Sequence, residues 1–565
     1  MTAHRRHPGT PHAAAALALL VGLVASGCGD SGSSSSKGSA SPTSAPATYD
    51  PLAIAYESRG RVTNLEAAIP PMCYTKTAGT SNPCWTCHTT SIPPNQMHDA
   101  GLQEEYAFSE VGLENHWTNL FRDRRPEIAA TTDDAILAWI RTDNYAPLVA
   151  AMKGATAFPG YRPDLDLARG FDEAGFARDG SGWRALRYQP FLGTFWPTNR
   201  STDDVFLRLP AAFRRDAAGR ESRDVYRANL AIVEASLGSD PARGDDRIDR
   251  QIEPIDETAI GADLDGDGRI AGVVTRIGVL PKAYVGGAAA TPAFRRELPA
   301  GTELLHSVRY VDPDAPNLLS ARMKELRYAV KDEPMDPWAR GRAYELELNE
   351  KEEGRTPVYK GGVDVGLGNA FGWRVQGFLE DREGRLRLQT EEEHRFCMGC
   401  HSTIGVTVDS TFSLARKVPG ADGWRWQDVR GLVDRPQAGH AEAEVLEYLR
   451  RVGGGDEFRA NPEILARFFP GGELAEAEVR RAGVGGDKDL RHLIVPSRER
   501  ALALDKAYLA VVREQSFTKG RDAVLAPMKN VHERIEGNGE TELGKAKRLF
   551  ADSRLQLDWS GGPAR

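Results

Sequence analysis

The sequence predicts a mainly α-helical fold with irregular coil and a smaller β component. Three observations lead to this fold class. Apolar residues recur at helical spacing in the C-terminal part of the chain, two cysteine–histidine motifs each fit one helical turn, and alternating runs typical of strands are short and mostly central. Because 565 residues exceed what one hydrophobic core usually organises, we expect two or three domains.

Residues 1–27 have the composition of an export signal. Arg5 and Arg6 precede an apolar stretch, 13–24, that is too short to span a bilayer. The next residues, Ala25-Ser26-Gly27-Cys28, resemble a bacterial lipobox, in which the cysteine becomes the lipidated first residue. We therefore expect lipidation at Cys28; an ordinary signal cleavage near Ala25 is the alternative.

Residues 28–48 are rich in Ser, Gly and Ala and predict a flexible tether behind the lipid. The resemblance to bacterial lipoproteins implies, from Gly29 directly after Cys28, an outer-membrane anchor. No second apolar run reaches spanning length, so the anchor is the expected membrane contact. The sequence thus predicts a lipid-anchored protein of the cell envelope, with its globular part in the periplasm or at the cell surface.

Two C-x-x-C-H pentapeptides predict the chemistry of the chain. They are Cys84-Trp85-Thr86-Cys87-His88 and Cys397-Met398-Gly399-Cys400-His401. Residues three apart on a helical turn share one face, so both sulfurs can bond one porphyrin, and the following histidine can ligate its iron. We expect two covalent haem c groups, attached at Cys84, Cys87, Cys397 and Cys400, with His88 and His401 as iron ligands.

Two other uses of these cysteines fit less well. A zinc ribbon pairs two C-x-x-C knuckles about 15–20 residues apart, whereas more than three hundred residues separate these motifs. A thioredoxin-type motif explains one C-x-x-C but gives no reason for a histidine after both.

The motifs divide the predicted globular part into three regions. We expect a first haem c domain over 49–163, a mixed middle region over 164–390 and a second haem c domain with a helical tail over 391–565, so that the haem-centred domains are cytochrome c-like. Expected helices cover 133–140, behind a capping Thr132, and 222–237; an expected strand covers 344–348 and a hairpin pairs 373–378 with 386–388. Expected tail helices cover 440–452, 474–482, 498–515 and 541–550.

The middle region also contains an acidic loop with calcium-ligand spacing. Asp263, Asp265 and Asp267 occupy positions 1, 3 and 5 of an EF-hand-type loop, and Arg269 can offer its carbonyl at position 7. Position 12 is Val274 instead of the usual bidentate glutamate, and a nearby acid such as Glu253, Asp256 or Glu257 could substitute for it. The alternative is a solvated acidic turn without an ion.

The ligand on the second face of each iron separates a carrier from a catalyst. An iron closed by a histidine or methionine transfers electrons, whereas an open site binds peroxide or dioxygen. We considered five candidate distal ligands: His98, His116, His306, His394 and His440. Of these, His306 lies in an apolar, strand-like run and could reach a haem of another domain. No catalytic acid or base can be assigned from the sequence.

Both pentapeptides and the lipobox-like signal resemble those of bacterial di-haem c-type cytochrome lipoproteins. That resemblance implies electron transfer between redox partners in the cell envelope. The alternative is a di-haem oxidoreductase of peroxidase or oxygenase type, similar to the di-haem peroxidases and rubber oxygenases, with one open haem site. The net charge of -8 argues against nucleic-acid binding and suits a basic redox partner.

Overall fold

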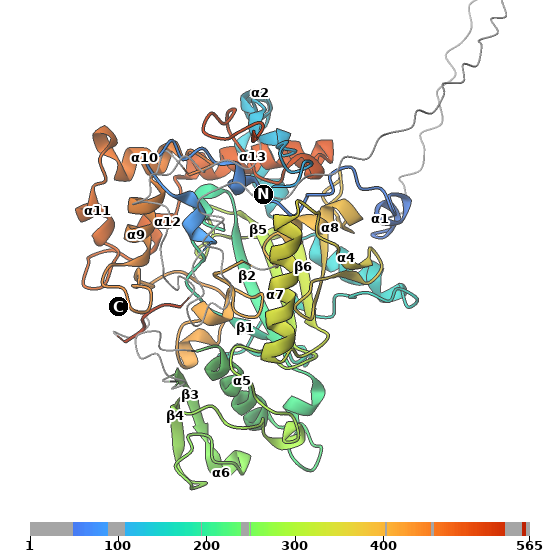
Figure 1. The fold of residues 1–565 in the computed structure, drawn as a ribbon, viewed down its shortest axis with the longest axis vertical. Helices are drawn as coiled ribbons and strands as arrows, with labels where there is room; N and C mark the ends of the chain where they lie inside the picture. The colour runs from blue at the N-terminus through green and yellow to red at the C-terminus, as the bar shows by residue number, and fades with distance from the viewer. Residues whose placement is uncertain are drawn as a thin grey trace, which may run out of the picture. The chain divides into compact units, whose positions relative to one another are not determined.

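The computed structural model describes residues 49–88, 108–193, 195–238, 248, 250–401, 404–453, 457–536 and 556–560. Tyr49–Arg565 forms one compact unit (Figure 1). The predicted signal, the tether and Cys28 lie outside the described residues, as do the expected helix over 541–550 and His98. The predicted domain boundaries within the body stay a prediction.

An eight-stranded antiparallel sheet forms the centre of this unit. Its strand order is β1-β2-β5-β6-β9-β8-β7, and β10 also pairs with β9. The strands are β1 (Arg184–Leu186), β2 (Thr202–Arg208), β5 (Glu303–Val311), β6 (Leu319–Lys331), β7 (Lys360–Gly362), β8 (Gly366–Gly368), β9 (Trp373–Glu380) and β10 (Leu386–Leu388). The predicted mainly α-helical, cytochrome c-like fold is therefore wrong.

The sheet escaped prediction for two physical reasons. Strands β2 and β5 are far apart in sequence yet pair along their whole length, from Thr202 with Arg309 to Arg208 with Glu303. In addition, β6 buries Lys324 and Glu325 at its centre, so its sequence lacks the apolar–polar alternation that marks a strand with one wet face. Neither strand pairing between distant segments nor buried, ion-paired side chains within a strand can be recognised from a short stretch of sequence.

Helices surround the sheet. They are α1 (Ala53–Glu57), α2 (Arg125–Ala130), α3 (Asp133–Ile140), α4 (Tyr145–Gly154), α5 (Arg223–Leu237), α6 (Glu257–Ile260), α7 (Pro337–Glu352), α8 (Glu391–Met398), α9 (Glu444–Val452), α10 (Pro462–Phe468), α11 (Glu476–Arg480), α12 (Arg491–Ile494) and α13 (Arg498–Glu514). The expected helices at α3 and α5 are confirmed, with Thr132 and Ser222 as their caps. The long α13 and the β9–β10 hairpin are confirmed as well.

The expected strand over 344–348 is wrong, because these residues belong to α7. Leu346 and Leu348 are 54% and 48% exposed, so their alternation with glutamate does not mark a buried face. The segment is rich in Ala, Leu, Glu and Arg, which favour helix in the absence of packing.

Charged contacts hold a second, smaller sheet to the body. Strands β3 (Arg250–Asp256) and β4 (Val273–Ile277) pair antiparallel and are joined through α6 and the acidic loop; in Figure 1 this ribbon lies at the lower end of the view. The buried Glu253 accepts hydrogen bonds from both terminal nitrogens of Arg184, at 2.5 and 2.8 Å, and so ties β3 to β1.

Candidate haem-binding site

The first motif begins in a short 3₁₀ helix, η2 (Pro83–Thr86), and Cys87 and His88 follow directly after it. Asn82 caps this helix by accepting a hydrogen bond from the backbone of Trp85. The backbone N–H groups of Cys87 and His88 both donate to the carbonyl of Cys84, at 3.1 and 2.9 Å. The two cysteines therefore lie one helical turn apart, the arrangement that attachment to one porphyrin requires.

The second motif ends helix α8 and has the same turn. The N–H groups of Cys400 and His401 both donate to the carbonyl of Cys397, each at 3.2 Å. Thr390 and Glu393 form a reciprocal capping box at the start of the helix. Glu393 also accepts two hydrogen bonds of 2.8 Å from Arg387 in the middle of β10, which fixes the helix against the sheet.

The two motif segments meet on one face of the large sheet. A side-chain carbon at Gly399 would lie 1.9 Å from the carbonyl oxygen of Ala68, so the absence of a side chain allows the second motif to contact the segment that leads to the first. Residues of both motifs, Cys87 from the first and Cys400 and His401 from the second, line one cavity. His88 is not among its lining residues.

The sheet forms one wall of this cavity. Val205, His306 and Arg327 lie side by side on β2, β5 and β6, in a cross-strand row that ends at Gly377 of β9. The next row on the same face runs from Leu207 through Leu304, Ala329 and Val375. Most other lining residues are apolar or aromatic, among them Leu298, Ile404, Phe412 and Leu414. A largely apolar lining with a few polar side chains is typical of cofactor sites.

His401 has the geometry of an iron ligand. Its Nδ1 lies 3.0 Å from the carbonyl oxygen of Ser410, which can only accept, so Nδ1 carries the proton and Nε2 keeps its lone pair. Burial, together with the nearby positive charge of Arg327, lowers the pKa of His401 to about 4. The imidazole is therefore neutral at physiological pH, as iron ligation requires.

The motif cysteines do not have the properties of a thiolate redox centre. Cys84, Cys397 and Cys400 are thiols rather than disulfides in this structure. Burial raises the pKa of Cys84 to about 12 and that of Cys400 to about 11. Reactive cysteines need a lowered pKa, so these two suit covalent attachment better than thiol–disulfide exchange.

Three of the candidate distal histidines lie outside the cavity lining. The Nε2 of His116 is 3.1 Å from the carbonyl oxygen of Val111. The Nε2 of His394 accepts a hydrogen bond of 3.0 Å from the N–H of Gly377, and burial lowers the pKa of His394 to about 3. His440 is half-buried in the loop before α9. None of the three is among the residues that line the cavity.

His306, the fourth candidate, does line the cavity and belongs to a hydrogen-bonded triad. Its Nε2 lies 3.1 Å from Oδ2 of Asp203, and the same oxygen accepts a hydrogen bond of 2.6 Å from the hydroxyl of Tyr188. Asp203 and Tyr188 are buried and line the cavity too. Sequence reasoning missed Asp203 and Arg327; the only signal for Asp203 was an acidic pair, Asp203-Asp204, at the start of an apolar run.

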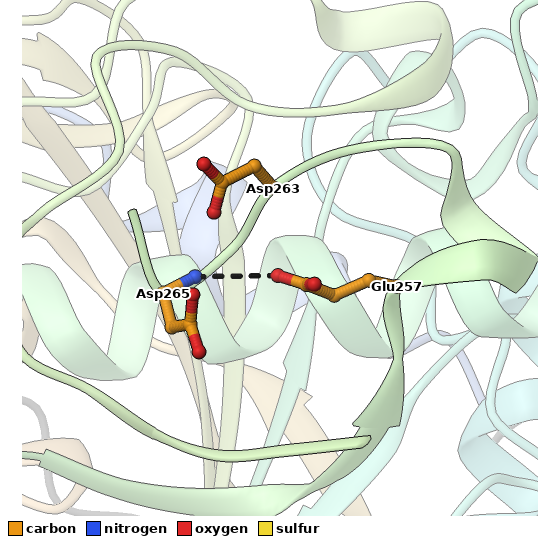
Figure 2. A group of neighbouring side chains, drawn as sticks. All are labelled: Glu257, Asp263 and Asp265. Carbon is orange, nitrogen blue, oxygen red and sulfur yellow. Dashed lines mark hydrogen bonds between the residues drawn. The ribbon is translucent and has the colours of Figure 1, made fainter. Parts of the chain in front are cut away.

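The acidic loop gathers three carboxylates (Figure 2). Oxygen atoms of Glu257, Asp263 and Asp265 lie within 4.8 Å of one another. Glu257 is one of the three acids that the sequence suggested as a substitute for the glutamate at position 12. It accepts hydrogen bonds from the N–H groups of Leu264 and Ala271. Asp263 accepts hydrogen bonds from the N–H groups of Gly266 and Gly268. Asp267 accepts a bond from the N–H of Arg269 and is not part of the group.

The comparisons with known proteins identify a lipoprotein family. A family model described as "-like lipoprotein" matches residues 58–484. A protein of Aquifex aeolicus (strain VF5), named "Uncharacterized lipoprotein", is 32% identical over 517 residues, which cover 81% of this chain and 86% of the relative. No solved structure matches. Among the described residues, no helix is both long and apolar enough to cross a bilayer.

These findings correct the expected resemblance to di-haem c-type cytochrome lipoproteins. Only the lipoprotein part agrees with the matching family, whose description does not name a cytochrome. The two C-x-x-C-H motifs occupy only two short segments of the chain and do not by themselves show the family to which it belongs. The family description supports the predicted lipid anchor and cell-envelope location. The chain belongs to this lipoprotein family.

Proposed function

We propose that this lipoprotein carries two covalently attached haem groups and transfers electrons between redox partner proteins of the cell envelope. One observation carries the proposal: two C-x-x-C-H motifs from opposite parts of the chain adopt the same turn and contribute residues to one cavity. The proposal rests on this local chemistry and not on membership of a cytochrome family.

The residues of the second motif fit haem attachment. Cys397 and Cys400 supply two thiols on one turn, and His401 presents a neutral Nε2 that the carbonyl of Ser410 orients. Leu304 and Val375 line the same cavity as His401 and make its walls largely apolar. When bound, haem supplies a one-electron iron couple whose potential depends on the axial ligand, hydrogen bonding and burial.

Electron transfer is favoured because the two attachment segments are adjacent. Gly399 contacts Ala68, and Cys87 shares the cavity with Cys400, so groups bound at the two motifs would lie close together. The net charge of -8 suits an association with basic redox partners. A lipid on Cys28, in the outer membrane as Gly29 implies, would hold the body near such partners.

The acidic loop supports a second cofactor, a calcium ion. Glu257, Asp263 and Asp265 offer oxygen ligands at a spacing that Ca²⁺ can bridge, and Glu257 supplies the acid that Val274 lacks. The loop joins β3 to β4, so an ion there would rigidify this ribbon. The alternative is an acidic turn held by its backbone hydrogen bonds alone.

A second candidate function, an oxidoreductase with one open haem site, is favoured by one observation. His306 lines the cavity with its Nε2 hydrogen-bonded to Asp203 instead of directed at an iron position. If no other side chain ligates the iron on the face opposite the motif histidine, a small oxidant could bind to the iron there.

Potentiometric titration of the mature protein tests electron transfer. We expect two one-electron steps, each with the visible spectrum of c-type haem, and only one step in the double variant Cys397→Ala/Cys400→Ala. Cys73→Ser, which changes a cysteine outside both motifs, should keep both steps. A protein without a haem spectrum, or one that neither accepts electrons from small donors nor passes them to a basic cytochrome, contradicts the proposal.

A further inference from the structure

His306 is positioned to exchange protons within the cavity. It is in the middle of β5, between β2 and β6, so its backbone is fixed on both sides. Its side chain is 19% exposed, and that of Asp203 is 6% exposed. The ring of Phe195 meets the imidazole edge-on at 5.2 Å. A histidine held this firmly cannot turn without breaking its bond to Asp203.

This bond decides which role the imidazole can take. Asp203 occupies Nε2, the nitrogen through which a histidine most easily reaches an iron. Nδ1, which lies next to Cβ, is sterically hindered for porphyrin iron but accessible to a small molecule. One oxygen of Asp203 accepts hydrogen bonds from both the imidazole and the phenol of Tyr188, so it fixes the orientation of the ring, as a carboxylate orients a catalytic imidazole elsewhere.

The charged groups around His306 are few and defined. Asp203 approaches from β2 and Tyr188 from the segment after β1, and Arg327 is its cross-strand neighbour on β6. Glu325 binds the guanidinium of Arg327 at 2.8 Å and that of Arg521 at 3.0 Å. His401 of the second motif lines the same cavity. The cavity therefore combines an acid–base residue, a cation and an iron ligand within largely apolar walls.

We propose that His306 is the acid–base residue for the two-electron reduction of a small peroxide in this cavity. The inference rests on the proposed haem attachment. In the balanced reaction the O–O bond of hydrogen peroxide breaks, two protons and two electrons are consumed, and two water molecules leave. His306 delivers one proton from Nδ1 and regains it there from solvent, which also supplies the other proton. Each bound haem would supply one electron, which a one-electron donor protein would replace.

Spectroscopy separates this role from iron ligation. In His306→Gln the amide can still donate to Asp203 but cannot exchange a proton. We expect unchanged haem content and an unchanged high-spin fraction in the oxidised protein, but cyanide association slower by about 10²-fold or more, because hydrogen cyanide must lose a proton on binding. If the variant instead gains a new high-spin haem, His306 is a ligand and the proposal is overturned.

Peroxide consumption provides the second readout. With a reduced donor protein the wild type should consume hydrogen peroxide, and both His306→Gln and Asp203→Asn should be slower by about 10²–10⁴-fold in turnover. The matched control is His492→Gln, since His492 also pairs with a carboxylate, Glu478 at 3.1 Å, but lies outside the cavity lining. If the protein carries two haems but consumes no peroxide, or if His306→Gln turns over as fast as the wild type, the inference is overturned and the proposed function stands. If the protein carries no haem, the proposed function is overturned as well.

Discussion

A buried ion pair between Glu393 and Arg387 holds helix α8, which contains Cys397 of the second motif, against the large sheet. Glu393, at the third position of α8, is fully buried and accepts two hydrogen bonds from Arg387. The positive charge of Arg387 outweighs burial and lowers the pKa of Glu393 to about 2. Because the helix leads directly into Cys397, this pair supports the geometry of the attachment site.

Replacing Glu393 by glutamine should lower the free energy of unfolding by about 3–5 kcal/mol, because Arg387 is left buried without its counter-charge. Glutamine can still complete the capping box, so the change isolates the charge. Glu391→Gln on the same helix is the control, since Glu391 makes only a 3.4 Å contact with Arg395 near the surface. Denaturant unfolding measures the stability of both variants. If Glu393→Gln is as stable as the wild type, the Glu393–Arg387 pair contributes nothing to stability.

The same pair predicts a pH dependence. The pKa of Glu393 is lower in the folded chain, about 2, than the ordinary 4.5, so its stabilising contribution is complete above pH 4.5 and is lost as the pH falls toward 2. Between these pH values the wild type should lose stability more steeply than Glu393→Gln. Parallel acid-unfolding curves for the two proteins would contradict this assignment.

At the scale of elements, the contact between the two motif segments depends on one glycine. Gly399→Ala places a carbon against the backbone oxygen of Ala68, which cannot move like the end of a flexible side chain. We expect a loss of about 1–3 kcal/mol in stability and incomplete haem attachment at the second motif.

The control for this substitution is Gly341→Ala in α7, where a side-chain carbon would meet nothing within 4 Å. It should raise stability by about 0.4–1 kcal/mol, because alanine favours helix and restricts the unfolded chain. Thermal unfolding and the ratio of haem to protein measure both variants. A Gly399→Ala protein with full stability and full haem content would show that the close contact is not required.

The calcium proposal belongs to the β3–β4 ribbon. Asp265→Asn should abolish any rise in melting temperature on adding Ca²⁺, because one of three carboxylates in the group is lost. Glu221→Gln, an exposed acid elsewhere, should keep the rise. If the wild type melts at the same temperature with Ca²⁺ and with a chelator, the loop is an acidic turn.

Sequence reasoning succeeded where the signal is local. Caps such as Thr132 and Ser222 mark their helices, and a polar turn marks the β9–β10 hairpin. The haem-binding role of the motif cysteines and of His306 stays a prediction, but Cys87, Cys400 and His306, which the sequence singled out, line one cavity. The contact of His306 with Asp203 was not predicted, because it joins residues 103 positions apart through strand pairing that neither segment reveals by itself.

At the scale of the whole molecule, the large sheet brings two distant motifs to one cavity. The body spans Tyr49–Arg565, and β2 pairs with β5 across about a hundred residues in the sheet that forms one wall of this cavity. Both motifs contribute residues to the cavity, and this arrangement couples them. It predicts that damage at one motif changes the environment of the other.

The central claim is that both motifs bind haem covalently, and the intact mass of the mature protein tests it most directly. After expression with the c-type haem attachment machinery, the account predicts a mass increased by two haem groups. Cys84→Ala/Cys87→Ala and Cys397→Ala/Cys400→Ala should each carry one haem, and the remaining haem should show a shifted spectrum. A mass without haem, or with zinc in its place, would contradict the account.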